Sequence, residues 1–136
     1  MANEYIRGFE ERECKFENCN NVCKSYDGTL VIPSGHNKIK FLQAYLESFN
    51  RYSWLGVYKE GSQAKDVEGT FVSGGVSTSI DDDECLRWDN GDLDMSSKEC
   101  DHDEYKPVCQ SSCPIGKHGL YSLETWHSNC CDVVSR

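Results

Sequence analysis

The segment ECLRWDNGDLDMSSKEC, Glu84–Cys100, places a loop rich in carboxylates between two cysteines. Three more aspartates, Asp81–Asp83, come directly before it. Its first residues, Glu84–Trp88, are typical of a short β-strand, and the Asp-Asn-Gly that follows is a turn sequence. The segment therefore predicts a strand that leads into an acidic loop, with a cysteine at each end to hold the loop in place.

Nine cysteines in 136 residues indicate disulfide bonds and an oxidising compartment. The length fits one domain with one moderate core. Zinc binding is the alternative use of the cysteines, but no Cys-x-x-Cys pair occurs. The one candidate Cys₂His₂ set lacks the close pairing of zinc sites; it consists of Cys113, His118, His127 and Cys130. Because the number is odd, one cysteine is either free or bonded to another chain, which would give a disulfide-linked dimer.

The formal net charge of −9 narrows the range of partners. Binding to nucleic acid or adsorption to anionic membranes needs a basic surface, so both are disfavoured. The charge fits a cation, a basic protein or simple solubility. No run is apolar enough to insert into a membrane. The sequence contains neither a serine elbow nor a glycine-rich phosphate loop, so neither of these motifs indicates an enzyme.

Two helices are expected in the first half of the chain. The first covers residues 9–27, ends before Gly28, and is followed by a strand over Thr29–Pro33. Ser34 can cap the second helix. Apolar residues at helical spacing support the first helix: Phe16, Cys19, Cys23 and Tyr26. The buried stripe of the second consists of Ile39, Leu42, Leu46 and Phe49, widened by Phe41 and Tyr45.

Short strands dominate the second half. Trp54 and Leu55 are the expected core residues of the first of them. Two helices followed by several short strands indicate the α+β class with an antiparallel sheet. The strand candidates are YSWLGVY (52–58), two strands around a Gly-Gly turn in GTFVSGGVSTSI (69–80), ECLRW (84–88) and YKPVCQ (105–110).

The ordered motifs of residues 9–110 resemble the C-type lectin-like domain family, as a divergent member with a reduced long loop. The family's first helix carries an aromatic, a small residue and a cysteine, which Phe16, Cys19 and Cys23 match, with cysteine in the small position. The resemblance implies two helices packed on small antiparallel sheets and stabilised by disulfides. The later matches are Trp54-Leu55-Gly56-Val57, Asp83-Glu84-Cys85, Asp89-Asn90-Gly91, Cys100 and Val108-Cys109.

The resemblance also implies two disulfide bonds, Cys23–Cys109 and Cys85–Cys100. Four of the other cysteines would pair and tie the C-terminal tail to the first helix. Cys19, on the apolar stripe, is alternatively a buried free thiol. The cysteines left over are Cys14, Cys19, Cys113, Cys130 and Cys131.

The lectin-like domain is expected to occupy residues 1–110, and residues 111–136 are a cysteine-rich tail without a strong period. The family usually opens with a hairpin, but few residues precede the first helix here. The tail resembles that opening, with a Cys-Pro start, a tyrosine, and a tryptophan before a cysteine. It is therefore either the start of a following module or a substitute for the missing strand.

Sugar-binding members hold one calcium ion between the protein and the sugar, and this chain keeps only part of that ligand set. Asp83 matches the acidic ligand two residues before the second cysteine. Leu93, Asp94 and Met95 take the places of a Trp-Asn-Asp triplet, and Met95 is no ligand for a hard cation. The proline-containing triplet is absent. Three alternatives remain: a solvated acidic surface, a docking face for a basic protein, or a non-standard calcium site made of Asp81, Asp82, Asp83 and Asp94, with Asp92 nearby.

The resemblance implies a secreted or surface-displayed recognition domain, not an enzyme, of the kind used in carbohydrate binding and cell adhesion. We expect it to bind an extracellular protein or a non-standard glycan through the loop region Val76–Asp94. The rival function is an acidic structural or matrix protein with weak calcium binding. Trp88 is either a surface aromatic that stacks on the ligand or a core residue. The expected ligand-binding residues are Trp88, Asp89, Asn90, Asp92 and Asp94.

Overall fold

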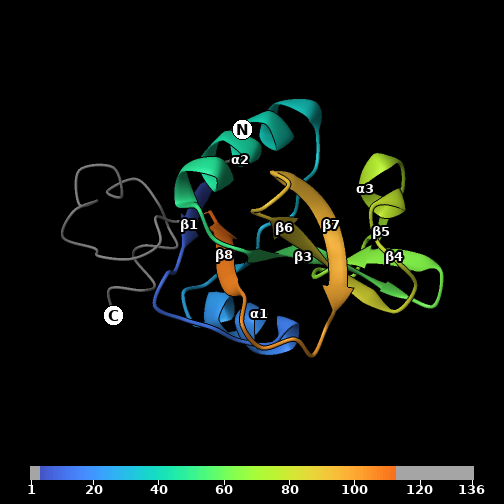
Figure 1. Cartoon of the computed structure of the whole chain (residues 1–136), viewed down its shortest axis with the longest axis horizontal. Helices are drawn as coiled ribbons and strands as arrows, with labels where there is room; N and C mark the ends of the chain where they lie inside the picture. Colours follow the sequence, from blue (N-terminus) through green and yellow to red (C-terminus); the bar gives the residue numbers. More distant parts are fainter. Residues whose placement is uncertain (1–3, 113–136) are drawn as a thin grey trace.

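A computed structural model describes residues 4–112 and confirms the α+β class, with disulfides joining the elements (Figure 1). Two long helices lie on opposite sides of the central strands. The elements are β1 (Tyr5–Gly8), α1 (Phe16–Lys24), β2 (Thr29–Leu30), α2 (His36–Phe49), β3 (Ser53–Glu60), β4 (Gln63–Asp66), β5 (Phe71–Val72), α3 (Gly75–Thr78), β6 (Glu84–Asp89), β7 (Asp94–Glu99) and β8 (Lys106–Ser111).

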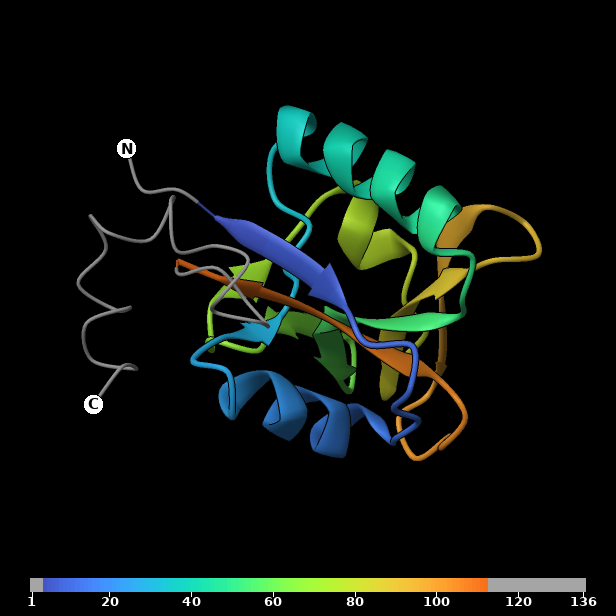
Figure 2. The same cartoon turned by 90° about the vertical axis from the view of Figure 1, so that its left-hand side faces the viewer.

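The strands form a branched sheet in the order β1-β8-β3-β4-β5, with β6 also pairing β3, β7 pairing β6 and β2 pairing β8. All pairs are antiparallel except β3 and β8, which run parallel, so the expectation of a purely antiparallel sheet is wrong at this point. Figure 2 shows β1 and β8 side by side between α1 and α2. None of the helices in residues 4–112 is long and apolar enough to span a membrane.

Strand β3 lies in the middle of the domain and has a core on each of its faces. Adjacent side chains of a strand point to opposite faces. Trp54 therefore packs with Phe16 on the α1 side, while Leu55 packs with Leu42 on the α2 side. Both Trp54 and Leu55 are completely buried, as the sequence predicts.

Helix α1 is shorter than expected, because the chain before Phe16 is not helical: it forms a turn at Glu10 and Glu11 and a bridge from Cys14 to Tyr105. Cys19 and Cys23 of the predicted stripe are fully buried. Tyr26 lies beyond the end of the helix and is 37% exposed. The next residue, Asp27, turns into the left-handed region with a φ of 63°. Gly28 allows the chain to approach β8 closely, because a Cβ at this position would lie 2.1 Å from the carbonyl oxygen of Gln110.

Helix α2 buries a narrower stripe than the sequence suggests. Leu42, Leu46 and Phe49 face the core, whereas Phe41 points away from it and is 58% exposed. The N-cap is Gly35 rather than Ser34, and no side chain caps the helix there. The prediction of a strand after the Gly-Gly turn is wrong, because residues 75–78 form the short helix α3.

A strand is present before the first helix, although the few residues there suggested that it is missing. Tyr5–Gly8 pairs antiparallel with Val108–Ser111 as strand β1. The tail is therefore not needed to supply it. The tail itself, with Cys113, Cys130, Cys131 and the alternative zinc set, lies outside the described residues.

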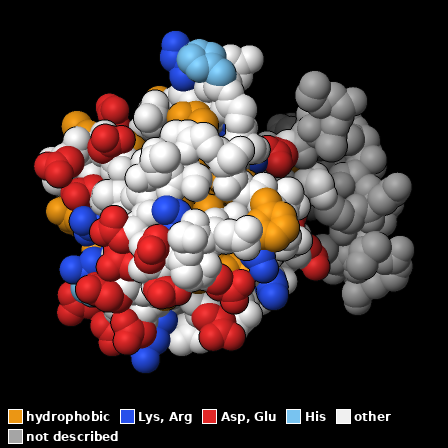
Figure 3. Space-filling view, turned by 90° about the vertical axis from the view of Figure 1, so that its right-hand side faces the viewer, with side chains coloured by type: hydrophobic (Ala, Val, Ile, Leu, Met, Phe, Trp, Pro, Cys, Tyr) orange, Lys and Arg blue, Asp and Glu red, His pale blue; other side chains and the backbone are white. Residues whose placement is uncertain are grey.

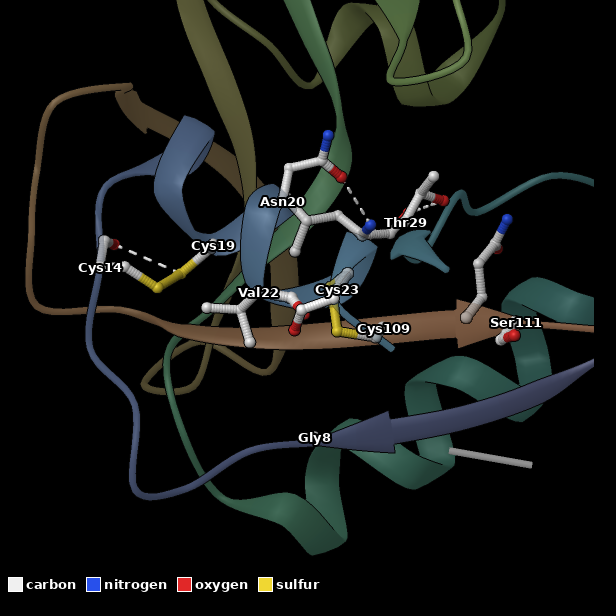
Figure 4. The surroundings of a disulfide bond; sticks show 12 residues. Gly8, Cys14, Cys19, Asn20, Val22, Cys23, Thr29, Cys109 and Ser111 are labelled. Atoms are coloured by element: carbon white, nitrogen blue, oxygen red, sulfur yellow. Dashed lines mark hydrogen bonds between the residues drawn. A yellow bond between two sulfur atoms is a disulfide. The ribbon is translucent and has the colours of Figure 1, made fainter. Parts of the chain in front are cut away.

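Three disulfide bonds join the described segments. Cys23–Cys109 ties α1 to β8, and Cys85–Cys100 closes the β6–β7 hairpin, so both pairings implied by the resemblance are confirmed. The third, Cys14–Cys19, joins α1 to the segment before it (Figure 4). Cys19 is therefore not a free thiol, and neither Cys14 nor Cys19 links the first helix to the tail.

We predict that Gly56→Ala destabilises the domain by about 1–3 kcal/mol, because the added methyl group overpacks a close approach between β3 and the end of β2. A Cβ at Gly56 would lie 2.4 Å from the carbonyl oxygen of Leu30. Urea unfolding measures the effect. Gly75→Ala is the matched control, since a Cβ there meets nothing within 4 Å. Equal stability of the two variants would contradict the prediction.

Candidate functional site

The acidic segment is a β-hairpin rather than a long loop. Strands β6 and β7 pair from Glu84 opposite Glu99 to Asp89 opposite Asp94, and only residues 90–93 form the turn. We call these residues with Asp94 the hairpin tip. The Cys85–Cys100 disulfide closes the other end of the hairpin. Strand β7 is a feature that the sequence reasoning missed.

Trp88 lies on the core face of the hairpin and is completely buried. It packs in the cluster that also contains Phe49 and Met95. The indole thus has no exposed face on which a ligand could stack, and the core alternative for this residue is correct. Its Nε1 is buried without a hydrogen-bond partner in the part of the chain that the structure describes.

Asp89 shapes the hairpin turn. One carboxylate oxygen accepts hydrogen bonds from the backbone N–H groups of Gly91, at 2.9 Å, and Asp92, at 3.2 Å. The other accepts one from the guanidinium of Arg87 at 3.2 Å. The side chain is only 14% exposed. Asp89 therefore holds the tip in shape and offers little surface to a ligand.

Asn90 joins the hairpin tip to the end of α2. Its side-chain nitrogen donates to the Oδ1 of Asn50 at 2.9 Å. Asn50 has a φ of 60° and follows the last residue of α2. The Oδ1 of Asn90 is buried and has no partner within residues 4–112. This contact positions the tip relative to the helix.

The exposed part of the tip consists of Gly91, Asp92, Leu93 and Asp94. Leu93 is 51% exposed and has a φ of 54°. The left-handed region is uncommon for a bulky side chain, and residues held there often lie at functional sites. Asp94 accepts a hydrogen bond from the next backbone N–H, that of Met95, at 2.8 Å. The tip thus presents one apolar side chain between two carboxylates.

The four aspartates expected to bind calcium do not form one site. Asp83 precedes the closed end of the hairpin, whereas Asp94 lies at its tip. The strand between them, Glu84–Asp89, spans roughly 17 Å at about 3.3 Å per residue. Across residues 4–112, no three His, Cys, Asp or Glu side chains come together as metal ligands do.

The three consecutive aspartates also have separate local contacts. The backbone N–H of Asp81 donates to Ser97 at 3.0 Å, and Asp82 lies 4.0 Å from Lys59. The carboxylate of Asp83 accepts a hydrogen bond from the backbone N–H of Gly61 at 2.6 Å. These contacts tie the segment to neighbouring strands. The donor set therefore does not fit a single calcium ion shared by these residues.

Sequence reasoning missed an aromatic and basic cluster on the other face of the hairpin. Arg87 donates to Ser96 at 2.9 Å and to the hydroxyl of Tyr105. The rings of Tyr105 and Tyr52 stack with their centroids 5.7 Å apart. Tyr52 is 39% exposed and provides the accessible end of the cluster. The sequence held one signal for this cluster. Arg87 and Asp89 lie two positions apart on one strand, and such residues share a face.

The family model described as the Lectin C-type domain matches residues 12–111. No curated protein matches the chain.

Solved structures of C-type lectins share the fold. TC14 from the tunicate Polyandrocarpa misakiensis superposes with a TM-score of 0.66 at 12% identity, covering 80% of this chain and 98% of TC14. The carbohydrate-recognition domain of the mouse scavenger receptor C-type lectin gives 0.62 at 15% identity, covering 82% and 90%. The calcium-independent C-type lectin SPL-2 from Saxidomus purpuratus gives 0.64 at 16% identity, covering 81% and 87%.

Proposed function

The chain belongs to the C-type lectin domain family, and from that premise we propose that it is an extracellular recognition domain that binds a basic protein through the hairpin tip. Domains of this family generally bind ligands and are not enzymes. The three disulfides are consistent with an oxidising, extracellular location.

The observation that carries the proposal is the exposure of Leu93. An apolar side chain at the end of a hairpin, held in the left-handed region, can enter a pocket of a partner. Asp89 and Asn90 restrain the turn, so little conformational entropy is lost on binding. Leu93 would thus serve as an anchor at the centre of the contact.

The charge of the chain supports a basic partner. Asp92 and Asp94 flank the anchor, and the net charge of the whole chain is −9. Charge complementarity of this kind mainly increases the association rate and weakens at high salt. Because the four candidate calcium ligands do not fit one ion, we propose that this contact requires no calcium.

A glycan is the second candidate ligand, and the exposed ring of Tyr52 favours it. Tyr52 is 39% exposed, and the Arg87 guanidinium lies 5.8 Å from its ring. Aromatic faces beside polar side chains are suited to sugars, with an apolar surface and directed hydrogen bonds. A glycan bound there would depend on Tyr52 and not on Leu93, which separates the two candidates.

The test uses a displayed library of random peptides selected on the immobilised chain. We expect enriched peptides to combine Lys or Arg with a large apolar residue. Leu93→Ser should weaken their binding about 10- to 30-fold, as burial of a leucine side chain contributes about 1.5–2 kcal/mol. The double variant D92N/D94N should lower the association rate several-fold at low salt and have little effect at high salt.

Phe41→Ser is the matched control, because Phe41 is a similarly exposed apolar residue on α2, 58% exposed. Binding should be unchanged in this variant and in EDTA. Peptides that bind Leu93→Ser as well as the parent chain would contradict the proposal. A glycan array in which binding is lost in Tyr52→Ala and retained in Leu93→Ser would favour the second candidate instead.

A further inference from the structure

A cavity of about 760 Å³ opens between the first turn of α1, the strand β3 and the closed end of the β6–β7 hairpin. This volume lies in the range of about 300–1,000 Å³ that small-ligand sites occupy. We propose that the cavity binds an arginine side chain presented by a partner protein. The site is separate from the hairpin tip and does not depend on the function proposed there.

The inner wall of the cavity is apolar and aromatic. Phe16 is only 8% exposed, and its ring meets that of Tyr58 edge-on, with centroids 6.0 Å apart. The Cys85–Cys100 disulfide forms the neighbouring wall. The hydroxyl of Tyr58 has no hydrogen-bond partner among the described residues. Such a wall can pack the aliphatic part of an arginine side chain and offers its guanidinium an aromatic face and an acceptor.

The rim of the cavity carries more negative than positive charge. Its carboxylates are Glu17, Glu60 and Asp101, and its one cation is Lys15. Glu60 is paired with Lys65, outside the cavity, at 3.2 Å. Within residues 4–112, the carboxylates of Glu17 and Asp101 have no ion-pair or hydrogen-bond partner.

The three carboxylates of the rim belong to three different segments of the chain, around one concave surface. Guanidinium matches carboxylates in planar, two-point geometry, which favours arginine over lysine. Figure 3 shows that Asp and Glu side chains, with some Lys and Arg among them, gather over the lower part of the side of the molecule where β4 and β5 lie. A basic residue would therefore be attracted to this side before it enters the cavity.

An anion is the competing occupant, because the N-terminus of α1 borders the cavity. Helix N-termini attract anions through free backbone N–H groups and the helix dipole. Here the N–H of Phe16 already donates to the carbonyl oxygen of Cys100 at 3.0 Å. Glu17 supplies a negative charge in the first turn of the helix. Since the rim adds two further carboxylates, a cation is favoured.

The test is a titration of the full chain, labelled with ¹⁵N, with Nα-acetyl-arginine amide followed by NMR. We expect saturable shifts of the backbone amides of Glu17, Tyr58 and Asp101 at millimolar concentrations. The double variant E17Q/D101N should weaken binding about tenfold, because two charge contacts to the guanidinium are lost. The matched control E47Q/E68Q removes the same charge at two exposed positions outside both the cavity and the hairpin tip, and it should bind like the parent chain.

The neutral isostere Nα-acetyl-citrulline amide distinguishes recognition of the charge from packing alone, and it should cause no saturable shift. Three outcomes would overturn the proposal. They are shifts that stay linear with arginine concentration, equal weakening in E17Q/D101N and E47Q/E68Q, and saturation of the same amides by sodium sulfate rather than by the arginine probe.

Discussion

Replacing Cys23 and Cys109 together with alanine is expected to lower the free energy of unfolding by about 4.5 kcal/mol. The disulfide joins residues 86 positions apart, and in the chain-entropy model a longer closed loop gives greater stabilisation. Both sulfur atoms are also buried, so their removal leaves space in the α1 core. A loss of this size approaches the whole stability of a small domain.

Urea unfolding without reductant measures this effect, and the Cys14–Cys19 bond provides an internal comparison. Its cysteines are only five positions apart, so the double variant C14A/C19A should lose about 2 kcal/mol. Removing the Cys85–Cys100 bond, with a separation of 15, should cost an intermediate amount, about 3 kcal/mol. If the shortest loop proved as stabilising as the longest, the entropic explanation would be wrong.

The second large effect is expected for Trp54→Ala, a loss of about 4 kcal/mol or more. Trp54 is completely buried, and its ring contacts those of Phe16 and Tyr105 with centroid distances of 5.7 and 4.9 Å. Its Nε1 donates to the carbonyl oxygen of Cys14 at 2.8 Å. The alanine variant would lose the packing and also leave that part-buried carbonyl group without its partner.

Thermal or urea unfolding of Trp54→Ala and Trp54→Phe separates these two contributions. Trp54→Phe keeps an aromatic ring but removes the donor, so it should lose about 1–3 kcal/mol. Phe41→Ala is the control at an exposed position and should change stability by less than about 0.5 kcal/mol. A loss in Trp54→Ala no greater than in Phe41→Ala would show that this residue does not organise the core.

The sequence predicted the elements whose packing follows from local pattern. The α2 stripe of Leu42, Leu46 and Phe49 is buried as expected, because helical spacing places these residues on one face. Phe41 shows the limit of this reasoning. It lies beside the stripe but turns away from the sheet, and periodicity does not say how wide the covering surface is.

The disulfides and the strand order required more than pattern. Cys23 and Cys109 lie far apart in the chain, and only the resemblance to a family connected them before the structure brought α1 and β8 together. Strand β7 was missed because its residues Asp94–Glu99 are partly exposed and all polar except Met95, so that no apolar alternation marks it. Pairing with β6 stabilises it instead.

The candidate sites show the same division. Composition alone established an acidic, disulfide-rich domain, and turn chemistry placed a turn at Asp89-Asn90-Gly91. Tertiary structure decided which carboxylates are neighbours. Asp83 and Asp94 are close in sequence but lie toward opposite ends of a hairpin, whereas Glu17 and Asp101 are distant in sequence and share one cavity. The reason is physical: a strand separates its ends by about 3.3 Å per residue, while packing of separate elements brings remote residues together.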